Sequence, residues 1–264
     1  MTSPLLAALG VLLAWWLSTG LILWRVRVAD NGPAHGHLHS VIGGLPLLGF
    51  GVWGALASSD DPSAFGVYLG FAAALALWGW VELAFLSGVL TGPNVAPSPA
   101  GLSPRARFIR AFLAVAWHEL ALAAIMIGLI LVQWAGQNTI SAATFALLLV
   151  ARTLAKINLF LGVPRINMQF IPGPINHMKS HFRIAPATGF LLLSICILVI
   201  LTVLLIIRAL DGVTPENSLG YTVLAALAAL ALLEHLFMVL PLPDAKLWAW
   251  MLPKAKPSIK TLKE

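Results

Sequence analysis

Long apolar runs dominate the chain, and short polar segments interrupt them at intervals that suit a membrane protein. A helix needs about 20 mostly apolar residues to cross the hydrocarbon of a bilayer. Seven segments meet this requirement, so the pattern predicts an all-α, polytopic integral membrane protein in which residues 1–241 form one seven-helix transmembrane domain. The predicted helices cover residues 4–24, 40–57, 65–90, 109–133, 139–161, 187–208 and 219–241.

The second segment is the poorest helix former of the seven. It contains several helix-disfavouring residues, namely Gly43, Gly44, Pro46, Gly49, Gly51 and Gly54. Such residues are tolerated in membrane helices where neighbouring helices restore the backbone hydrogen bonds. We therefore expect this segment to pack against other helices.

Composition supports a lipid environment for most of the chain. Of 264 residues, 59% are hydrophobic and 10% are charged, and the mean hydropathy is +0.91. A soluble domain cannot bury so much apolar surface. The single cysteine, Cys196, lies in an apolar run and has no intrachain partner for a disulfide.

The basic residues lie in alternate loops, which predicts an orientation. Under the positive-inside rule, Lys and Arg mark the cytoplasmic loops. With seven crossings one side receives Arg25, Arg27, Arg105, Arg107, Arg110, Arg165, Lys179, Arg183, Lys246, Lys254, Lys256, Lys260 and Lys263. The other side receives Asp60, Asp61, Asp211 and Glu216, with Arg208 as its basic residue. The N-terminus is thus predicted to be periplasmic and residues 242–264 to form a basic, cytoplasmic tail at the lipid interface. The high isoelectric point reflects this asymmetry and not a nucleic-acid-binding surface.

Several ionisable residues fall inside the predicted helices, where they are costly and therefore candidates for function. Arg152 and Lys156 are four residues apart and share one face of a helix, so we expect them to pair with carboxylates. An alternative is that this layer only holds the helices together. The intramembrane polar layer consists of Glu82, His118, Glu119, Arg152, Lys156, Glu234 and His235.

Histidines offer two further kinds of chemistry. His118 and His235 are candidate axial ligands of a chlorin magnesium or a haem iron, or core residues held by the neighbouring glutamates. The clusters His35, His37, His39 and His177, His181 resemble the histidine boxes of di-iron oxygenases only poorly, because those enzymes use more histidines. We predict no metal site and no enzymatic activity, since the sequence also has no Walker loop, nucleophile elbow or dinucleotide-binding motif.

Residues 162–186 form a long predicted loop in which prolines, basic residues and apolar residues occur together. Pro164 is predicted to end the helix before it, and Pro186 to start the helix after it. Met168, Phe170, Ile171 and Phe182 are too apolar for a bare aqueous loop. We therefore interpret it as a docking loop for a partner or the lipid interface. Its candidate docking residues are Arg165, Asn167, Phe170, Lys179, His181, Phe182 and Arg183.

This region carries a family resemblance. The stretch "KINLFLGVPRINMQFIPGPINHMKSHFR" resembles the characteristic segment of the PuhE-type photosynthetic complex assembly proteins of anoxygenic phototrophic bacteria. The similarity rests on residues 161–164, Asn167, Pro172 and residues 180–182, and it departs from the family pattern at Arg165, where that pattern has asparagine. Members are of similar length and polytopic, so the resemblance extends over almost the whole chain.

The resemblance implies an assembly factor or accessory subunit of the bacterial reaction centre–light-harvesting core complex that modulates bacteriochlorophyll supply. It implies a multi-pass protein of the bacterial inner (intracytoplasmic) membrane, with reaction-centre and light-harvesting subunits and membrane lipids as partners. Bacteriochlorophyll, a carotenoid and bound lipids are the candidate ligands, and the sequence selects none of them. A carrier of pigment or another small molecule is the alternative function, and a membrane metalloenzyme is a more distant one.

Overall fold

A computed structural model describes residues 3–212, 214–243 and 246–247, and this part of the chain is helical with no strand. Its helices are α1 (Pro4–Asp30), α2 (Gly36–Gly43), α3 (Leu45–Ser58), α4 (Ala64–Leu86), α5 (Pro104–Gln133), α6 (Ile140–Leu161), α7 (Gly189–Leu210) and α8 (Pro215–Phe237), with the 3-10 helices η1 (Met168–Phe170) and η2 (Gly173–His181). Most of the predicted interfacial tail lies outside the described residues.

Seven helical segments are long and apolar enough to cross a membrane, with α2 and α3 together forming one of them. The expected multi-pass, all-helical architecture is therefore confirmed. At about 1.5 Å per residue, helices of 22–30 residues span the roughly 30 Å of bilayer hydrocarbon. Which terminus faces which compartment stays a prediction.

Several helix ends differ from those predicted because capping residues set them. α5 starts at Pro104 and not at 109, since the Ser103 side chain accepts a hydrogen bond from the Ala106 N–H. α4 stops at Leu86 and not at 90, shortly before Gly88 with its φ of +74°. α8 begins four residues early, capped by Thr214. The polar residues just before the apolar runs thus form the first turns of α5 and α8.

The loop between α6 and α7 begins and ends differently from the prediction based on its prolines. α6 ends at Leu161, and Gly162 adopts a φ of +131°, a conformation that residues with a side chain rarely adopt. Pro164 therefore lies inside the loop and not at the helix end. α7 starts at Gly189 with Thr188 as its cap, three residues after Pro186.

The second span is interrupted, as its composition suggested. The backbone turns at Gly44, between α2 and α3, and Pro46 occupies the first turn of α3, where its missing N–H costs no helical hydrogen bond. Two glycines of α3 face α4 closely: a Cβ at Gly51 would lie 2.6 Å from Leu77 Cγ, and one at Gly54 3.0 Å from Ala73 Cβ. These glycines allow α3 to pack directly against α4.

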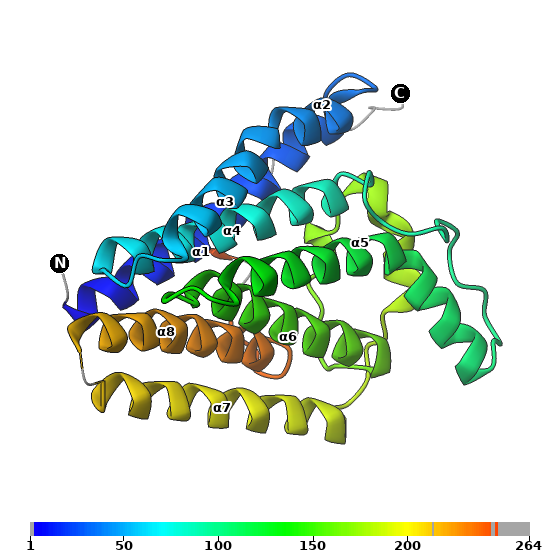
Figure 1. Cartoon of the computed structure of the whole chain (residues 1–264). Coiled ribbons are helices and arrows are strands. Elements are labelled where there is room, and N and C mark those ends of the chain that lie inside the picture. The colour runs from blue at the N-terminus through cyan, green and yellow to red at the C-terminus, as the bar shows by residue number, and fades with distance from the viewer. Residues whose placement is uncertain (1–2, 213, 244–245, 248–264) are drawn as a thin grey trace, which may run out of the picture.

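The spans are not all parallel. Figure 1 shows α7 and α8 side by side, while α1 and α3 incline away from them across the molecule. Early residues of four helices form the largest apolar core, which contains Val11 of α1, Phe71 of α4, Leu147 of α6 and Val223 of α8. Toward their C-terminal ends, α1, α4, α6 and α8 diverge from one another.

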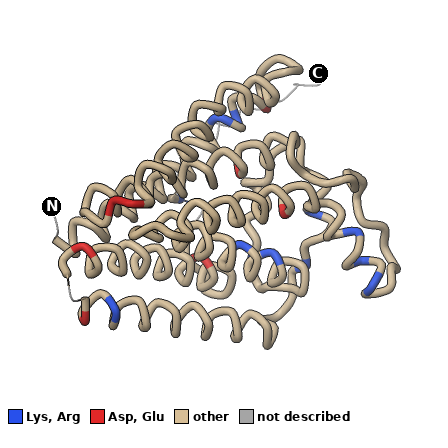
Figure 2. The backbone as a smooth tube through the Cα atoms, viewed as in Figure 1, with Lys and Arg blue, Asp and Glu red and all other residues tan. Residues whose placement is uncertain are grey.

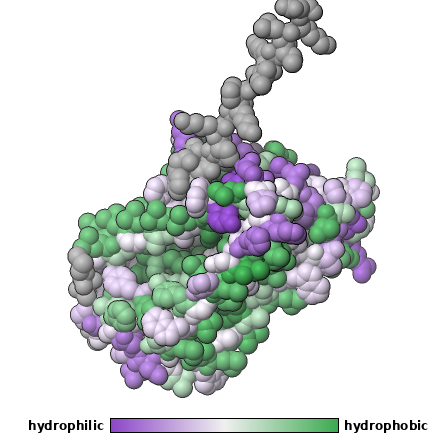
Figure 3. All heavy atoms as spheres, turned by 90° about the horizontal axis from the view of Figure 1, so that it is seen from above, coloured by the Kyte–Doolittle hydropathy of each residue, from purple (hydrophilic) through white to green (hydrophobic). Residues whose placement is uncertain are grey.

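Charge separates the two ends of the bundle. We call the end with Asp60, Asp61 and Glu216 the acidic end, and the end with Arg105 and Arg183 the basic end; most Lys and Arg lie toward the latter (Figure 2). Hydrophobic residues cover much of the face between them, and strongly hydrophilic ones gather at opposite ends (Figure 3). This distribution suits a protein embedded in lipid.

Candidate functional site

A cavity of about 480 Å³ lies where α1, α4, α6 and α8 diverge toward the basic end. Its walls come from residues 15–23 of α1, 75–86 of α4, 148–159 of α6 and 227–237 of α8, with Val115 and His118 of α5, and residues 165–182 lie over part of it. Pockets of about 300–1,000 Å³ are typical of small-molecule sites. The helices that pack tightly at the acidic end thus leave room for a ligand at the basic end.

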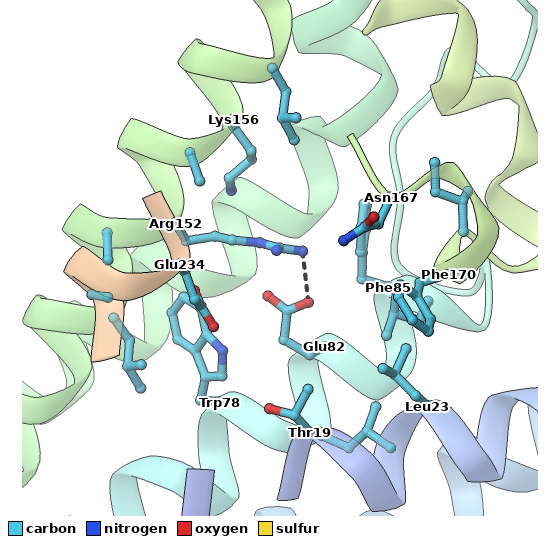
Figure 4. A pocket seen from close by; sticks show the side chains of 18 of the residues that line it. Thr19, Leu23, Trp78, Glu82, Phe85, Arg152, Lys156, Asn167, Phe170 and Glu234 are labelled. Atoms are coloured by element: carbon cyan, nitrogen blue, oxygen red, sulfur yellow. Dashed lines mark hydrogen bonds and ion pairs between the residues drawn. The ribbon is translucent and has the colours of Figure 1, made fainter. Parts of the chain in front are cut away.

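The cavity contains the centre of the polar layer. Arg152 of α6 donates to Glu82 of α4, with 3.1 Å between Nη2 and Oε2 (Figure 4). One turn further along α6, Lys156 pairs with Glu119 of α5. Each cation expected to need a carboxylate partner has one, and both cations line the cavity.

Glu234 supplies a third carboxyl group from α8. It accepts a hydrogen bond from the indole N–H of Trp15, with 3.0 Å between Nε1 and Oε1. Glu234 is exposed and lines the cavity. A bound molecule would therefore meet this carboxyl group directly.

Polar and aromatic groups from other elements complete the cavity. Figure 4 shows Asn167 of the loop directed toward Arg152, with Thr19 on the wall formed by α1. Aromatic rings make much of the remaining wall, namely Trp15, Trp78, Phe85, Phe170, Phe182 and Phe237. The arrangement combines one compact polar centre with flat apolar surfaces.

His118 and His235, the two candidate pigment ligands, lie in different environments. His118 lines the cavity, is 0% exposed, and neither ring nitrogen has a hydrogen-bond partner among the described residues. Its ring lies against Phe85, with 4.4 Å between centroids. His235 instead pairs through Nδ1 with the Ala231 carbonyl at 2.8 Å and is a core residue outside the cavity lining. His118 is thus the better placed of the two for a ligand.

The 162–186 segment is held against the bundle by contacts with distant parts of the chain. Its two ends pair with each other, since the Val163 N–H donates to the Arg183 carbonyl at 3.1 Å. The Arg165 N–H donates to the Met238 carbonyl at 3.1 Å, and its guanidinium donates to the Leu240 carbonyl. The segment therefore forms a folded cover over the cavity, which we call the cover segment.

The predicted docking residues have several positions within the cover segment. Phe170 and Phe182 line the cavity, and His181 is buried at 4% exposure. Arg165 binds backbone carbonyls after α8, and Asn167 faces the cavity (Figure 4). Lys179 is half-buried and Arg183 is exposed. The apolar side chains that suggested docking are thus half-buried, and Phe170, Ile171 and Phe182 among them line the cavity.

The histidine clusters show pairwise contacts. His37 Nε2 lies 3.3 Å from Asp30 Oδ1, and the rings of His35 and His39 are 6.3 Å apart. Burial lowers the pKa of both His177 and His181. Within the described part of the chain, no three His, Cys, Asp or Glu side chains are grouped as metal ligands.

Sequence reasoning found the ionisable residues of this site but not its walls. Trp15 and Trp78 lie within their helices and not at the ends favoured by interfacial tryptophans. Their position inside a span was the signal that could have indicated an interior polar partner, because a buried indole N–H needs an acceptor. Trp15 has that acceptor in Glu234.

Fold and site together define a polytopic helical membrane protein with a charged, aromatic-walled cavity at its basic end. A family model described as "Protein of unknown function (DUF3623)" matches residues 1–258, and the chain belongs to this family. It is 47% identical over 264 residues, covering 100% of this chain and 96% of the relative, to the uncharacterized 30.4 kDa protein in the puhA 5' region of Rhodobacter capsulatus. No solved structure matches the chain.

Proposed function

We propose that this protein is a PuhE-type accessory factor, without enzymatic activity of its own, for assembly of the photosynthetic reaction centre–light-harvesting core complex. One observation carries the proposal: the relative that matches the full length of the chain is encoded next to the photosynthesis gene puhA. A multi-pass architecture supports it, because a factor for this complex must meet its subunits and pigments in the membrane.

The exposed surface of the basic end is the surface proposed for partners. Ile184 is 66% exposed beside the exposed Arg183, and Phe108 of α5 is 57% exposed. Apolar area contributes affinity, while the positive charges steer acidic partners. In this proposal the cover segment presents Arg183 and Ile184 to partners, while its half-buried phenylalanines line the cavity.

A deletion strain of a phototrophic host tests this proposal. Complementation with the wild-type gene should restore the core complex, measured by bacteriochlorophyll absorption of membranes and by co-purification of core subunits. The double variant Arg183→Glu, Ile184→Asp should reduce both several-fold, because it reverses the charge and removes the apolar contact.

A matched double variant at the other end provides the control. Arg208→Glu with Leu210→Asp changes the same residue types, and Leu210 is 81% exposed, so this protein should complement fully. If deletion leaves core-complex levels and pigment unchanged and no core subunit co-purifies, the assembly function is wrong.

A carrier is the second candidate, and the cavity is the observation that favours it. A carrier must open its site to each side of the membrane in turn. In the described conformation the core around Val11, Phe71 and Val223 closes the acidic end. A deletion strain that builds normal core complexes but accumulates a small molecule on one side of the membrane would support the carrier.

A further inference from the structure

We infer that the cavity binds a neutral, planar, carbonyl-bearing amphiphile of the quinone class. This inference goes beyond the proposed function and does not depend on it. Four features carry it: the unused donors of Arg152, the charge balance at the polar centre, the aromatic walls, and the unpartnered His118.

Arg152 supplies hydrogen-bond donors that the protein does not use. A guanidinium has five N–H donors and accepts nothing. In the described structure the partner of Arg152 is Glu82, and its Nε is buried without an acceptor. The Arg152 side chain is nevertheless 37% exposed, so a ligand oxygen in the cavity could accept from its accessible N–H groups.

The balance of charged side chains at the polar centre favours a ligand with a neutral head group. Arg152 pairs with Glu82 and Lys156 pairs with Glu119, so both cations already have an acid. Glu234 adds a third carboxyl group to the same region and Arg165 adds a third cation, so the charges are already balanced at three of each. An anionic head would bring a further negative charge close to Glu82 and Glu234, and like charges at short range repel strongly where water is scarce. A carbonyl oxygen accepts from Arg152 without that repulsion.

The aromatic walls of the cavity favour a ligand with a flat, apolar ring system. Trp78 and Phe85 of α4 and Phe170 of the cover segment surround the polar centre (Figure 4). Aromatic rings pack favourably against other rings in offset or edge-to-face geometry. The cavity volume of about 480 Å³ is in the range of pockets that hold drug-sized molecules.

His118 is the independent observation that points to a ligand. A fully buried imidazole with neither nitrogen hydrogen-bonded is unusual, because buried polar groups almost always have partners. His118 lies in the cavity wall, against Phe85. A second oxygen on the ring, as a quinone has, would provide the missing partner for the ring N–H once the His118 side chain turns toward the cavity, because this side chain is 0% exposed in the described conformation.

Binding of decylubiquinone to the purified full chain in nanodiscs tests this inference. We expect saturable retention of about one quinone per protein after empty nanodiscs are subtracted. Ala155→Phe, which places a ring in the cavity wall, should weaken binding about tenfold or more, equivalent to at least about 1.4 kcal/mol. Ala124→Phe, on an exposed face of α5, is the matched control and should bind as the wild type does.

A second variant covers the case in which Ala155→Phe fails to fold. The double change Glu82→Gln, Arg152→Gln removes the ion pair without leaving a buried charge unpaired, and it should also weaken quinone binding about tenfold. Palmitate, an anionic amphiphile, should compete poorly. Absence of saturable binding, equal binding by the wild type and the folded variants, or displacement by palmitate in preference to quinone would overturn the inference.

Discussion

Arg152 and Lys156 show how two similar side chains on one helix acquire different surroundings. Both project from one face of α6, but Arg152 reaches Glu82, which is 8% exposed, while Lys156 pairs with the half-buried Glu119. Loss of one partner from a truly buried pair costs about 3–5 kcal/mol, and a pair with access to solvent contributes far less. The side chains of Arg152 and Glu82 are 37% and 11% exposed, and those of Lys156 and Glu119 are 23% and 24% exposed, so the two pairs are about equally accessible and both fall between these limits.

His181 makes stability depend on pH. Burial is the largest cause that lowers its pKa below the ordinary 6.5, and His177, Arg110 and Arg107 lower it further. Between the folded pKa and 6.5 the unfolded chain binds more protons, so stability is complete above pH 6.5 and falls as the pH decreases through this window. We expect a lower melting temperature at pH 5.5 than at pH 7.5, by about 2–4 °C for each kcal/mol lost.

His181→Gln should reduce this pH dependence, because one of the two histidines of the segment with a lowered pKa is gone while His177 remains. Circular dichroism of the protein in detergent gives the melting temperature, and proteolysis of the cover segment gives a local measure. His39→Gln, at an exposed position, is the control and should leave the dependence intact. An unchanged slope in His181→Gln would show that the destabilisation arises elsewhere.

At the scale of elements, glycines decide how closely α3 approaches α4. A Cβ at Gly51 would lie 2.6 Å from Leu77 Cγ and 3.0 Å from the Leu77 backbone nitrogen, whereas one at Gly49 would meet nothing within 4 Å. Gly51→Ala should therefore separate the two helices and destabilise the protein by about 1–3 kcal/mol, as overpacking does. Thermal unfolding in detergent measures the loss.

Gly49→Ala is the matched substitution on the same helix. It should be neutral, or stabilising by up to about 1 kcal/mol, because alanine is the better helix former. Equal losses in both variants would mean that the helix backbone, and not its packing on α4, requires these glycines.

For the whole molecule, the separation of charge between the two ends predicts its orientation. Asp60 and Asp61 lie in the connection between α3 and α4, and Arg183 lies in the one between α6 and α7, so the positive-inside rule places Asp60 in the periplasm. In a Cys196→Ser background, Asp60→Cys should react with an impermeant maleimide on intact cells, and Arg183→Cys only after the cells are broken. Labelling of both from the same side would contradict the topology.

The spans could be predicted from the sequence because each is a long apolar run. The ends of a span could not be predicted where a capping residue sets them. Ser103 caps α5, which begins at Pro104 among charged residues. A hydropathy pattern alone assigns such charged residues to the loop and not to the helix. The residues of the polar layer could likewise be identified from the sequence, because each is an ionisable residue inside an apolar run. The cavity could not, because it depends on the divergence of four helices and on contacts such as Arg165 with Met238, which join parts of the chain far apart in sequence.

The attachment of the cover segment also imposes an order on biosynthesis. The guanidinium of Arg165 binds a carbonyl 75 residues further along, at Leu240. At translation rates of about 5–20 residues per second, that acceptor is made roughly 4–15 s after Arg165. Five spans can thus enter the bilayer before the cover segment can be attached to the end of α8. A hydrophobic molecule in the surrounding lipid can therefore enter between the helices during this interval without having to displace the cover segment.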